Sequence, residues 1–463
     1  MTEAGARPVR EGDRIETLDV LRGVAIFGIF MVNIGLFSMP LMDFVQGMHG
    51  DDVSQGDKIG AAIVKIFFEY KFVTLFSFLF GAGMVLQLTR MRDKGVPYTG
   101  VYLRRTLLLM LIGAVHACLI WYGDILFIYS WVALLAFFIW KSPPKVMLTI
   151  AGVFLALGIA MTAGFMALQV AMASNANTAL VEDEGADAPA STDDEEAEIV
   201  EDGAEEGAAD DGAADAEAPE EGSIGAFLEE LGAAWENQQT GPEKLSRLET
   251  RVYGEGPVEH VLIMRISTWL SMLIFAVVLS GFGIRIVSMF LIGGAMMKLE
   301  FHSPRHLKKQ KILAALGLTL GIGGETLAWF LASKAGPTPT ALTVGSESLR
   351  FITSILLCMG YISTICVLVN TGALRWLQHA FASVGRMALT NYLAQSLIAT
   401  GVFYWWGLGK FGTFSRPEQL YFVIAIYVGQ IIFSVIWMKI FRIGPAEWLW
   451  RSMTYLKPQP LLR

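Results

Sequence analysis

The 463-residue sequence has little charge and almost no cysteine. Charged residues make up 17% of the chain, below the ~25% that is typical of soluble proteins. The three cysteines lie in apolar stretches without a Cys-x-x-Cys spacing, which argues against a disulfide framework. The sequence has no His/Cys/carboxylate cluster with metal-ligand spacing, and no P-loop, Gly-x-Ser-x-Gly or His-Glu-x-x-His motif. We therefore expect no metal site and no nucleic-acid partner, and a soluble enzyme is not expected either.

Long apolar runs dominate the sequence instead, since 54% of the residues are hydrophobic. A membrane-spanning helix needs ~20 mostly apolar residues. The predicted fold class is an all-α polytopic membrane protein with about ten transmembrane helices, or eleven if 261–300 crosses twice. We expect one broken crossing there, with Arg285 at the break. The predicted spans are 18–39, 60–88, 105–122, 124–140, 146–172, 261–300, 311–333, 347–369, 384–405 and 419–441.

The net charge of −8 is a sum over two unlike parts. Residues 182–221 hold 19 acidic residues and no Lys or Arg, so the rest of the chain carries a charge of +11. Basic residues concentrate in alternate short loops, and the positive-inside rule then places both termini in the cytoplasm. The loops and ends that carry this signal contain Arg7, Arg10, Arg14, Arg90, Arg92, Lys94, Arg104, Arg105, Lys141, Lys145, Lys308, Lys309, Lys311, Arg442, Arg451 and Lys457.

Three segments follow from these patterns. An N-terminal transmembrane half at 1–174 holds the first five spans, and a C-terminal transmembrane half occupies 258–463. Between them, 175–257 is an extracytoplasmic loop whose acidic tract cannot bury enough apolar surface to fold. A disordered spacer is the plain interpretation of this tract, and a role in concentrating cations is the alternative. After the tract, helical spacing predicts an amphipathic helix on the outer membrane surface, with apolar residues Ile224, Phe227, Leu228, Leu231 and Trp235.

Ionisable groups at membrane depth are costly and are therefore candidate functional residues. His116 lies within a span, and imidazole suits proton transfer near neutral pH. Asp124 follows eight residues later, across a turn at Gly123, and could orient the ring. A buried, hydrogen-bonded structural histidine is the alternative. His49, in the first outer loop, is a second candidate for proton transfer.

Other polar groups are candidates for binding a substrate. Asp19 and Arg22 share a helix face at the cytoplasmic end of the first span, where arginines could attract an anionic donor. Structural ion pairs and hydrogen bonds are the alternative for each. The candidate substrate-binding residues are Asp19, Arg22, Asn33, Lys71, Arg104, Arg105, Arg386, Asn391 and Gln395.

Several further residues are expected to serve packing. Gly81 and Gly83 would permit close approach of helices, and Gly293 and its neighbours could support contact between protomers of a homo-oligomer. Glu69 and Lys71 do not face each other on a helix, so we expect separate partners for them. Near the C-terminus, Glu447 and Arg451 could pair at i,i+4 within an anchoring segment. That segment also contains the interfacial aromatics Trp448, Trp450 and Tyr455.

Taken together, five segments resemble the YeiB family, bacterial inner-membrane proteins that contain the domain of unknown function 418. They are Thr17-Leu-Asp19-Val-Leu-Arg22-Gly23, Leu75-Phe-Ser77-Phe-Leu-Phe-Gly81, His116 to Asp124, Gly385-Arg386 with Thr390-Asn391-Tyr392, and Phe441 to Trp448. The first segment is also similar to the transmembrane acyltransferase superfamily. That resemblance implies transfer of an acyl group from a cytoplasmic thioester to an outer acceptor through a histidine. The superfamily's histidine would correspond to His49, whereas the YeiB pattern stresses His116 with Asp124.

The leading hypothesis is accordingly a multi-pass protein of the bacterial cytoplasmic membrane with acyltransferase-like chemistry. Its donor could be acyl-CoA, and its partners would be membrane lipids and a small-molecule or lipid substrate. The alternative is a transporter or exporter of a small metabolite or lipid without covalent chemistry. A non-catalytic scaffold is a third possibility, against which the many intramembrane polar groups argue.

Overall fold

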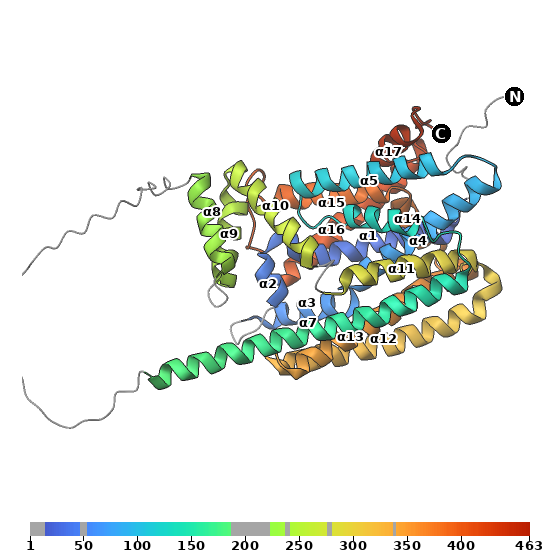
Figure 1. Cartoon of the computed structure of the whole chain (residues 1–463). Coiled ribbons are helices and arrows are strands. Elements are labelled where there is room, and N and C mark those ends of the chain that lie inside the picture. The colour runs from blue at the N-terminus through green and yellow to red at the C-terminus, as the bar shows by residue number, and fades with distance from the viewer. Residues whose placement is uncertain (1–13, 47–52, 187–222, 237–240, 276–279, 337–338) are drawn as a thin grey trace, which may run out of the picture.

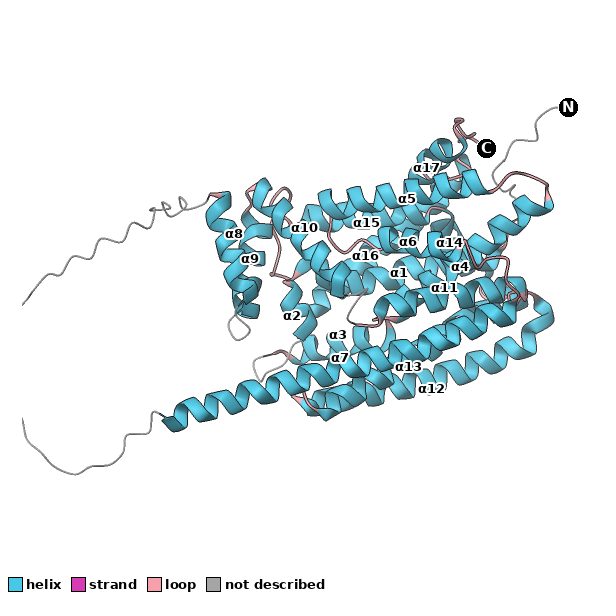
Figure 2. Ribbon diagram, viewed as in Figure 1, coloured by secondary structure: helices cyan, strands magenta, loops and turns pink. Residues whose placement is uncertain are grey.

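The computed structural model describes residues 14–46, 53–186, 223–236, 241–275, 280–336 and 339–463. In this part of the chain the regular structure is helical, apart from one isolated bridge between Phe441 and Leu462 (Figure 2). His49 and residues 187–222 of the acidic tract lie outside the described residues. The loop and cation-concentrating interpretations of the tract therefore stay predictions.

Seven described segments are long and apolar enough to cross a membrane. They comprise α1 (Glu16–Ser38), α3 with α4 (Gln55–Phe67 and Lys71–Asp93), α5 (Thr99–Leu119), Pro144–Ser174 of α7 (Pro144–Ala186), η3 with α12 (Pro304–His306 and Leu307–Ala335), α13 (Ala341–Thr371) and α16 (Arg416–Ile440). The shorter helices are α2 (Leu41–Gln46), α6 (Leu126–Ala136), α8 (Ile224–Glu236), α9 (Gly241–Glu255), α10 (Val258–Ile274), α11 (Phe282–Lys298), α14 (Arg375–Arg386), α15 (Ala388–Phe403) and α17 (Pro445–Tyr455). A polytopic helical membrane protein is thus confirmed, while ten crossings with cytoplasmic termini remain a prediction.

The expected span at 60–88 is not one continuous helix. The helix is interrupted between α3 and α4, where Tyr70 takes a left-handed conformation with φ of 64°. The Lys71 ammonium donates to the carbonyl of Lys65, one of the last carbonyls of α3. A cation is favourable at a helix C-terminus, so this polar contact stabilises the end of α3 as α4 begins.

Two other expected spans are also divided. The run at 261–300 forms α10 and α11, which follow each other in the same general direction (Figure 1). Arg285 lies in the first turn of α11, just after the break expected at this residue. The run at 384–405 divides at Met387 into the end of α14 and the whole of α15. The break expected within 261–300 is therefore observed, a few residues before Arg285, whereas a single continuous helix was the wrong prediction for 384–405.

Burial separates a central helix from peripheral ones. In α1, 72% of the apolar window is buried, compared with 17% in α7. A helix that is apolar on all sides suits the centre of a bundle, because every face meets protein. On α7 and α12, large apolar side chains such as Val153, Leu157, Leu316 and Leu320 stay exposed and suit contact with lipid.

Glycines allow the central helices to touch backbone to backbone. A Cβ at Gly81 would lie 1.8 Å from the carbonyl oxygen of Phe290, and one at Gly293 would lie 1.9 Å from that of Phe78. The packing role predicted for Gly81 is confirmed, whereas a Cβ at Gly83 would meet only Arg22, at 3.5 Å. Gly293 is occupied by this contact between α4 and α11, so it is not free to support the protomer contact expected of it.

The helix predicted after the acidic tract is α8, which lies beside α9 at the left of the molecule (Figure 1). Some residues of its apolar face pack against the protein, and others are exposed. Phe227 and Leu231 are buried, and the Phe227 ring stacks on His260 at 4.3 Å, whereas Leu228 and Trp235 are exposed. Part of the apolar face therefore packs on protein, and the placement of this helix on the outer membrane surface stays a prediction.

Alanine at Gly81 should prevent stable folding, because its Cβ would overlap the backbone of α11. We expect the Gly81→Ala variant to be recovered as aggregate or to melt well below the wild type in detergent. Gly323→Ala in α12 is the matched control, since a Cβ there meets no atom within 4 Å. Size-exclusion chromatography of heated samples measures the difference, and equal melting of the two variants would contradict the packing argument.

Glu249 of α9 makes stability depend on pH. Its side chain is 1% exposed, and Oε2 accepts the backbone N–H of Leu41 at 2.6 Å. Burial raises the pKa of Glu249 to about 8, against ~4.3 in an unfolded chain. The folded protein therefore binds one more proton than the unfolded chain between these values, and its stability falls as pH rises through that window.

We expect Glu249→Gln to remove this loss, because a neutral amide oxygen can still accept from Leu41. The Tm of the variant should exceed that of the wild type by a few degrees at pH 8 and by much less at pH 5. Thermal melts in the same detergent across this range provide the measurement. A variant whose Tm falls in parallel with that of the wild type would show that Glu249 is not the group responsible.

Candidate functional site

Three side chains from three parts of the chain form a continuous hydrogen-bonded row. Nδ1 of His116 lies 2.9 Å from Oδ2 of Asp124, and Nε2 lies 2.8 Å from Oγ of Ser396. His116 comes from α5, Asp124 from the turn before α6, and Ser396 from α15. All three are buried, with exposed fractions of 1%, 4% and 1%. The predicted pairing of His116 with Asp124 is thus present in the structure, with a hydroxyl added at the other end of the ring.

The surroundings of Asp124 fix the direction of these hydrogen bonds. Its Oδ1 accepts the backbone N–H of Phe127 at 2.8 Å, as an N-terminal cap of α6, and Oδ2 lies 3.5 Å from the hydroxyl of Tyr392. A carboxylate oxygen can only accept hydrogen bonds, and Oδ2 faces Nδ1 of His116. The proton of a neutral His116 therefore sits on Nδ1, and Nε2 is left as an acceptor that faces Ser396.

A cavity of about 290 Å³ begins next to this row. Tyr392 and Ile125 line the cavity, and the Tyr392 ring lies 5.2 Å from the ring of His116. Apolar side chains line much of the space, including Ile26, Phe76, Leu79, Phe80, Met84, Leu109, Leu126 and Phe290. Tyr392 thus stands between the row of three residues and an apolar chamber.

Arginines surround the other part of the same cavity. They come from the segment before α1 and from α1, α4, α5, α14 and α17, and they are Arg14, Arg22, Arg90, Arg105, Arg386 and Arg451. The two carboxylates in the lining are already engaged. Asp19 pairs with Arg14 at 3.2 Å and with Arg22 at 2.9 Å, and Glu447 caps another helix. The lining therefore carries an excess of positive charge beside an apolar chamber.

The crowding of these cations is electrostatically unfavourable in the cavity as it stands. Burial, followed by the like charges of Arg14 and Arg105, lowers the pKa of Arg451 to about 10. Arg451 stays protonated at neutral pH, so the repulsion is not relieved by loss of a proton. A bound anion would relieve it, and guanidinium groups bind phosphate and carboxylate oxygens in a bidentate manner.

Glu447 corrects an expectation. It forms no ion pair with Arg451 within the described residues; instead Oε1 accepts the backbone N–H of Leu389 at 2.6 Å, and Oε2 accepts the hydroxyl of Thr390 at 2.5 Å. These atoms belong to the first turn of α15, where a carboxylate is favourable. Glu447 therefore anchors the N-terminus of the helix that carries Ser396.

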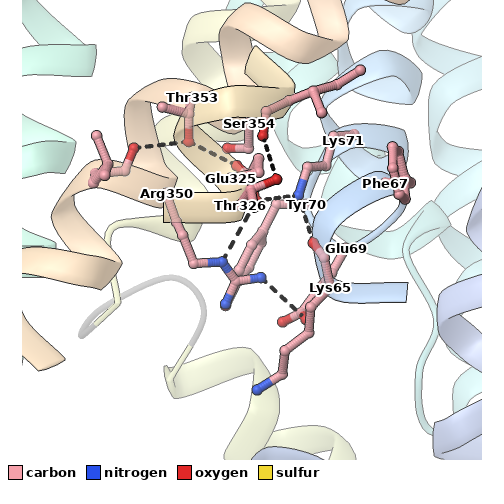
Figure 3. A network of polar contacts seen from close by, with 12 residues as sticks. Lys65, Phe67, Glu69, Tyr70, Lys71, Glu325, Thr326, Arg350, Thr353 and Ser354 are labelled. Carbon is pink, nitrogen blue, oxygen red and sulfur yellow. Dashed lines mark hydrogen bonds and ion pairs between the residues drawn. The ribbon is translucent and has the colours of Figure 1, made fainter. Parts of the chain in front are cut away.

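A second polar cluster surrounds the break between α3 and α4 (Figure 3). Lys71 is fully buried and pairs with Glu325 of α12 at 2.5 Å, whereas Glu69 pairs with Arg350 of α13 at 3.2 Å. The separate partners expected for Glu69 and Lys71 are therefore observed. Arg350 also lies 3.7 Å from Glu325 and 3.2 Å from Glu347, which joins the pairs into one network. Lys71 lies in this network and does not line the cavity.

The other predicted binding residues fall into two groups. Asp19, Arg22, Arg105 and Arg386 line the cavity together. The remaining four do not line it, and three of them make structural contacts. Arg104 donates to the carbonyl of Thr454 in α17, Asn391 donates to Ser434 at 3.1 Å, and Gln395 donates to Gln430 at 2.8 Å, while Asn33 is half-buried in α1.

Comparison with known proteins places the chain among relatives of similar length. It is 32% identical to the uncharacterized protein YxaH of Bacillus subtilis, over 99% of this chain and 98% of the relative. It is 30% identical to the uncharacterized protein YeiB of Escherichia coli, over 97% and 98% of the two chains. The family described as "Protein of unknown function (DUF418)" matches residues 296–457. The chain belongs to the YeiB family. No solved structure matches it.

In this YeiB-family protein the matched region holds Ser396, Arg386 and the α12–α13 part of the charged network. His116 and Asp124 lie outside it, so the row of three residues joins the matched region to the N-terminal half. The relatives' names state no activity, and the function must therefore be argued from the geometry.

Sequence reasoning missed Ser396 as the third member of the row. It lies 280 positions from His116, and no local spacing connects them. Arg14 and Arg90 were interpreted only as charges that orient the chain, and Arg451 also as a partner of Glu447, although all three line the cavity. The one available signal was the polar patterning of α15, in which Ser396 directly follows Gln395 inside an apolar run.

The Lys71–Glu325 pair generates a stability prediction. Lys71→Met should destabilise the protein by about 3–5 kcal/mol, because it removes the nearer cation from a buried carboxylate and leaves only the longer contact with Arg350. The double variant Lys71→Met/Glu325→Leu should melt at a higher temperature than the single variant, since no unpaired charge remains from this pair. Arg92→Ala, which removes an exposed ion pair with Asp93, should have little effect. Equal losses in the single and double variants would show that the ion pair is not what the single change disrupts.

Proposed function

We propose that this protein is an acyltransferase of the bacterial cytoplasmic membrane. It would take an acyl group from an anionic donor that enters from the cytoplasmic side, with acyl-CoA as the model donor. It would pass the group to an acceptor at or beyond the membrane. The observation that carries this proposal is the Asp124–His116–Ser396 row next to a cavity that is apolar on one side and lined by arginines on the other.

The donor side follows from the lining of the cavity. Arg22 and Arg105, which the sequence predicts to attract an anionic donor, would bind its phosphates, and the other arginines of the lining would join them. Arg104 has no part in this, because its side chain holds α17 through Thr454. The apolar chamber between α1, α4 and α5 suits an acyl chain, whose burial is favourable by ~0.8 kcal/mol per CH₂.

The proposed chemistry depends on Nε2 of His116, which is free to take a proton when the ring is neutral. Acyl transfer needs a base that removes the proton from an attacking hydroxyl or amine, and a neutral imidazole does this near pH 7. Asp124 orients the ring and stabilises the imidazolium that forms. The acyl carbonyl would have to pass Tyr392, whose side chain separates the chamber from the row and would swing aside on donor binding.

The acceptor side would lie beyond His116, away from the arginines. Trp121 lies 6.3 Å from the His116 ring, and beyond it Tyr122, Tyr253 and Tyr404 form an aromatic cluster. The indole N–H of Trp121 and the hydroxyls of Tyr253 and Tyr404 are buried without a hydrogen-bond partner in the described residues. Unpaired buried donors are costly, and a hydroxyl-bearing acceptor would supply their missing partners.

Transport of an anionic substrate without covalent chemistry is the second candidate. The observation that favours it is the breaking of three predicted spans, at Phe68–Tyr70, between α10 and α11, and at Met387. Broken helices at membrane depth are common around transporter binding sites. Under this alternative the substrate crosses unmodified, and the row of three residues serves only to hold α5 and α15 together.

The test uses inside-out membrane vesicles that contain the full chain, with radiolabelled acetyl-CoA and, separately, palmitoyl-CoA. The wild type should transfer label to an extractable lipid or glycan, and His116→Ala should lower the rate by ~10²–10⁴-fold. His260→Ala is the control, because this histidine is also buried but lies in α10 outside the row. No labelled product with either donor, or equal rates in the His116 variant and the wild type, would overturn the proposal. Label recovered inside the vesicles as unchanged donor would favour transport.

A further inference from the structure

We infer that Ser396 carries the acyl group as an ester between donor and acceptor, so that transfer proceeds in two covalent steps. This inference rests on the proposed acyl transfer and deepens it, because His116 could equally act as a base on the acceptor with no intermediate. The two mechanisms differ in what His116 faces, and the structure places a serine hydroxyl there.

The hydrogen bonding of Ser396 differs from that of three other buried serines. Ser77, Ser130 and Ser288 each donate to the carbonyl four residues earlier in their own helix at 2.8 Å, the usual arrangement in membrane helices. Oγ of Ser396 lies 3.4 Å from the corresponding carbonyl, that of Tyr392, and 2.8 Å from Nε2 of His116. Its proton therefore points at the imidazole and not at its own helix.

The rest of the row supports this direction of the proton. Asp124 is held as an acceptor by the N–H of Phe127, so Nδ1 of His116 carries the proton and Nε2 receives the hydrogen bond of Ser396. A serine whose proton is held by a carboxylate-oriented imidazole is an activated nucleophile. The first turn of α15, held by Glu447, and the Gln395–Gln430 bond fix the helix on either side of this contact.

The first step consumes the thioester. Oγ of Ser396 attacks the acyl carbonyl carbon, and Nε2 of His116 takes the hydroxyl proton. The carbon–sulfur bond breaks, the proton passes from His116 to the departing thiolate, and the products are free CoA thiol and an ester on Ser396.

The second step restores the protein. The hydroxyl of the acceptor attacks the ester carbonyl while Nε2 takes its proton. The bond from the acyl carbon to Oγ then breaks, and the proton returns to Oγ. No oxidant, reductant or metal is needed. The intermediate also lets the donor leave the arginine-lined cavity before the acceptor reaches the row.

The experiment follows acyl label on the protein itself. Purified full-length protein in nanodiscs, without acceptor, is mixed with radiolabelled acetyl-CoA or palmitoyl-CoA, quenched in acid and examined for bound label. Wild-type protein should carry label that alkaline hydroxylamine removes, and Ser396→Ala should carry none and lose transfer by at least tenfold. Ser396→Cys should carry label that hydroxylamine removes at neutral pH, as expected of a thioester. Ser130→Ala, a change at another fully buried serine, should behave like the wild type.

Two outcomes overturn the inference while leaving the proposed function intact. One is transfer by Ser396→Ala at a rate near that of the wild type. The other is absence of bound label from both the wild type and Ser396→Cys while the vesicle assay shows transfer. If the wild type transfers no acyl group to any product, the proposed function fails and the inference fails with it.

Discussion

A polar side chain buried among membrane helices must find its partner inside the protein, because lipid offers none. This constraint organises the chain. Where α3 meets α4, it draws Lys71 to Glu325 and Glu69 to Arg350, and these contacts bring α12 and α13 against the break. Around α5 it draws Asp124 and Ser396 to the two nitrogens of one imidazole. The glycine contacts of α4 and α11 then let the helices approach closely enough for such partners to meet.

The charged network at the α3–α4 break and the arginines of the cavity differ in how their charges are paired. This difference distinguishes a structural network from a candidate binding site. Around the break, Lys71 and Arg350 form ion pairs with Glu69, Glu325 and Glu347. Arg285 adds a hydrogen bond to Ser354 and lies over the ring of Phe351, contacts that hold a cation in place. This cluster has the properties of a structural network.

Much of the fold could be predicted from sequence, because apolar length and charge asymmetry act locally along the chain. The pairing of His116 with Asp124 was also within reach, since eight residues and one turn separate them. The break between α3 and α4 was harder to predict, because the apolar run continues on both sides of Glu69 and Tyr70. Only a partner on a distant helix makes this interruption favourable. The contacts of Ser396 and Glu447 were not predicted for the same reason. Each acts on an element far away in the chain, and helical spacing carries no information about such contacts.

The arginine-lined cavity departs from the balance found at the break. Six arginines share the lining with two carboxylates, and one of these carboxylates is occupied by capping α15. Repulsion of this kind lowers stability, and after burial it contributes to the lowered pKa of Arg451. Where a local rule is broken in this way, the compensating gain is expected in function. An anion that enters the cavity would regain the electrostatic free energy that folding gave up, and the apolar chamber beside the arginines adds a place for a chain attached to that anion. Under the proposed function, the position of the chamber against Tyr392 would direct the attached chain toward His116 and Ser396, and binding and chemistry would share one path.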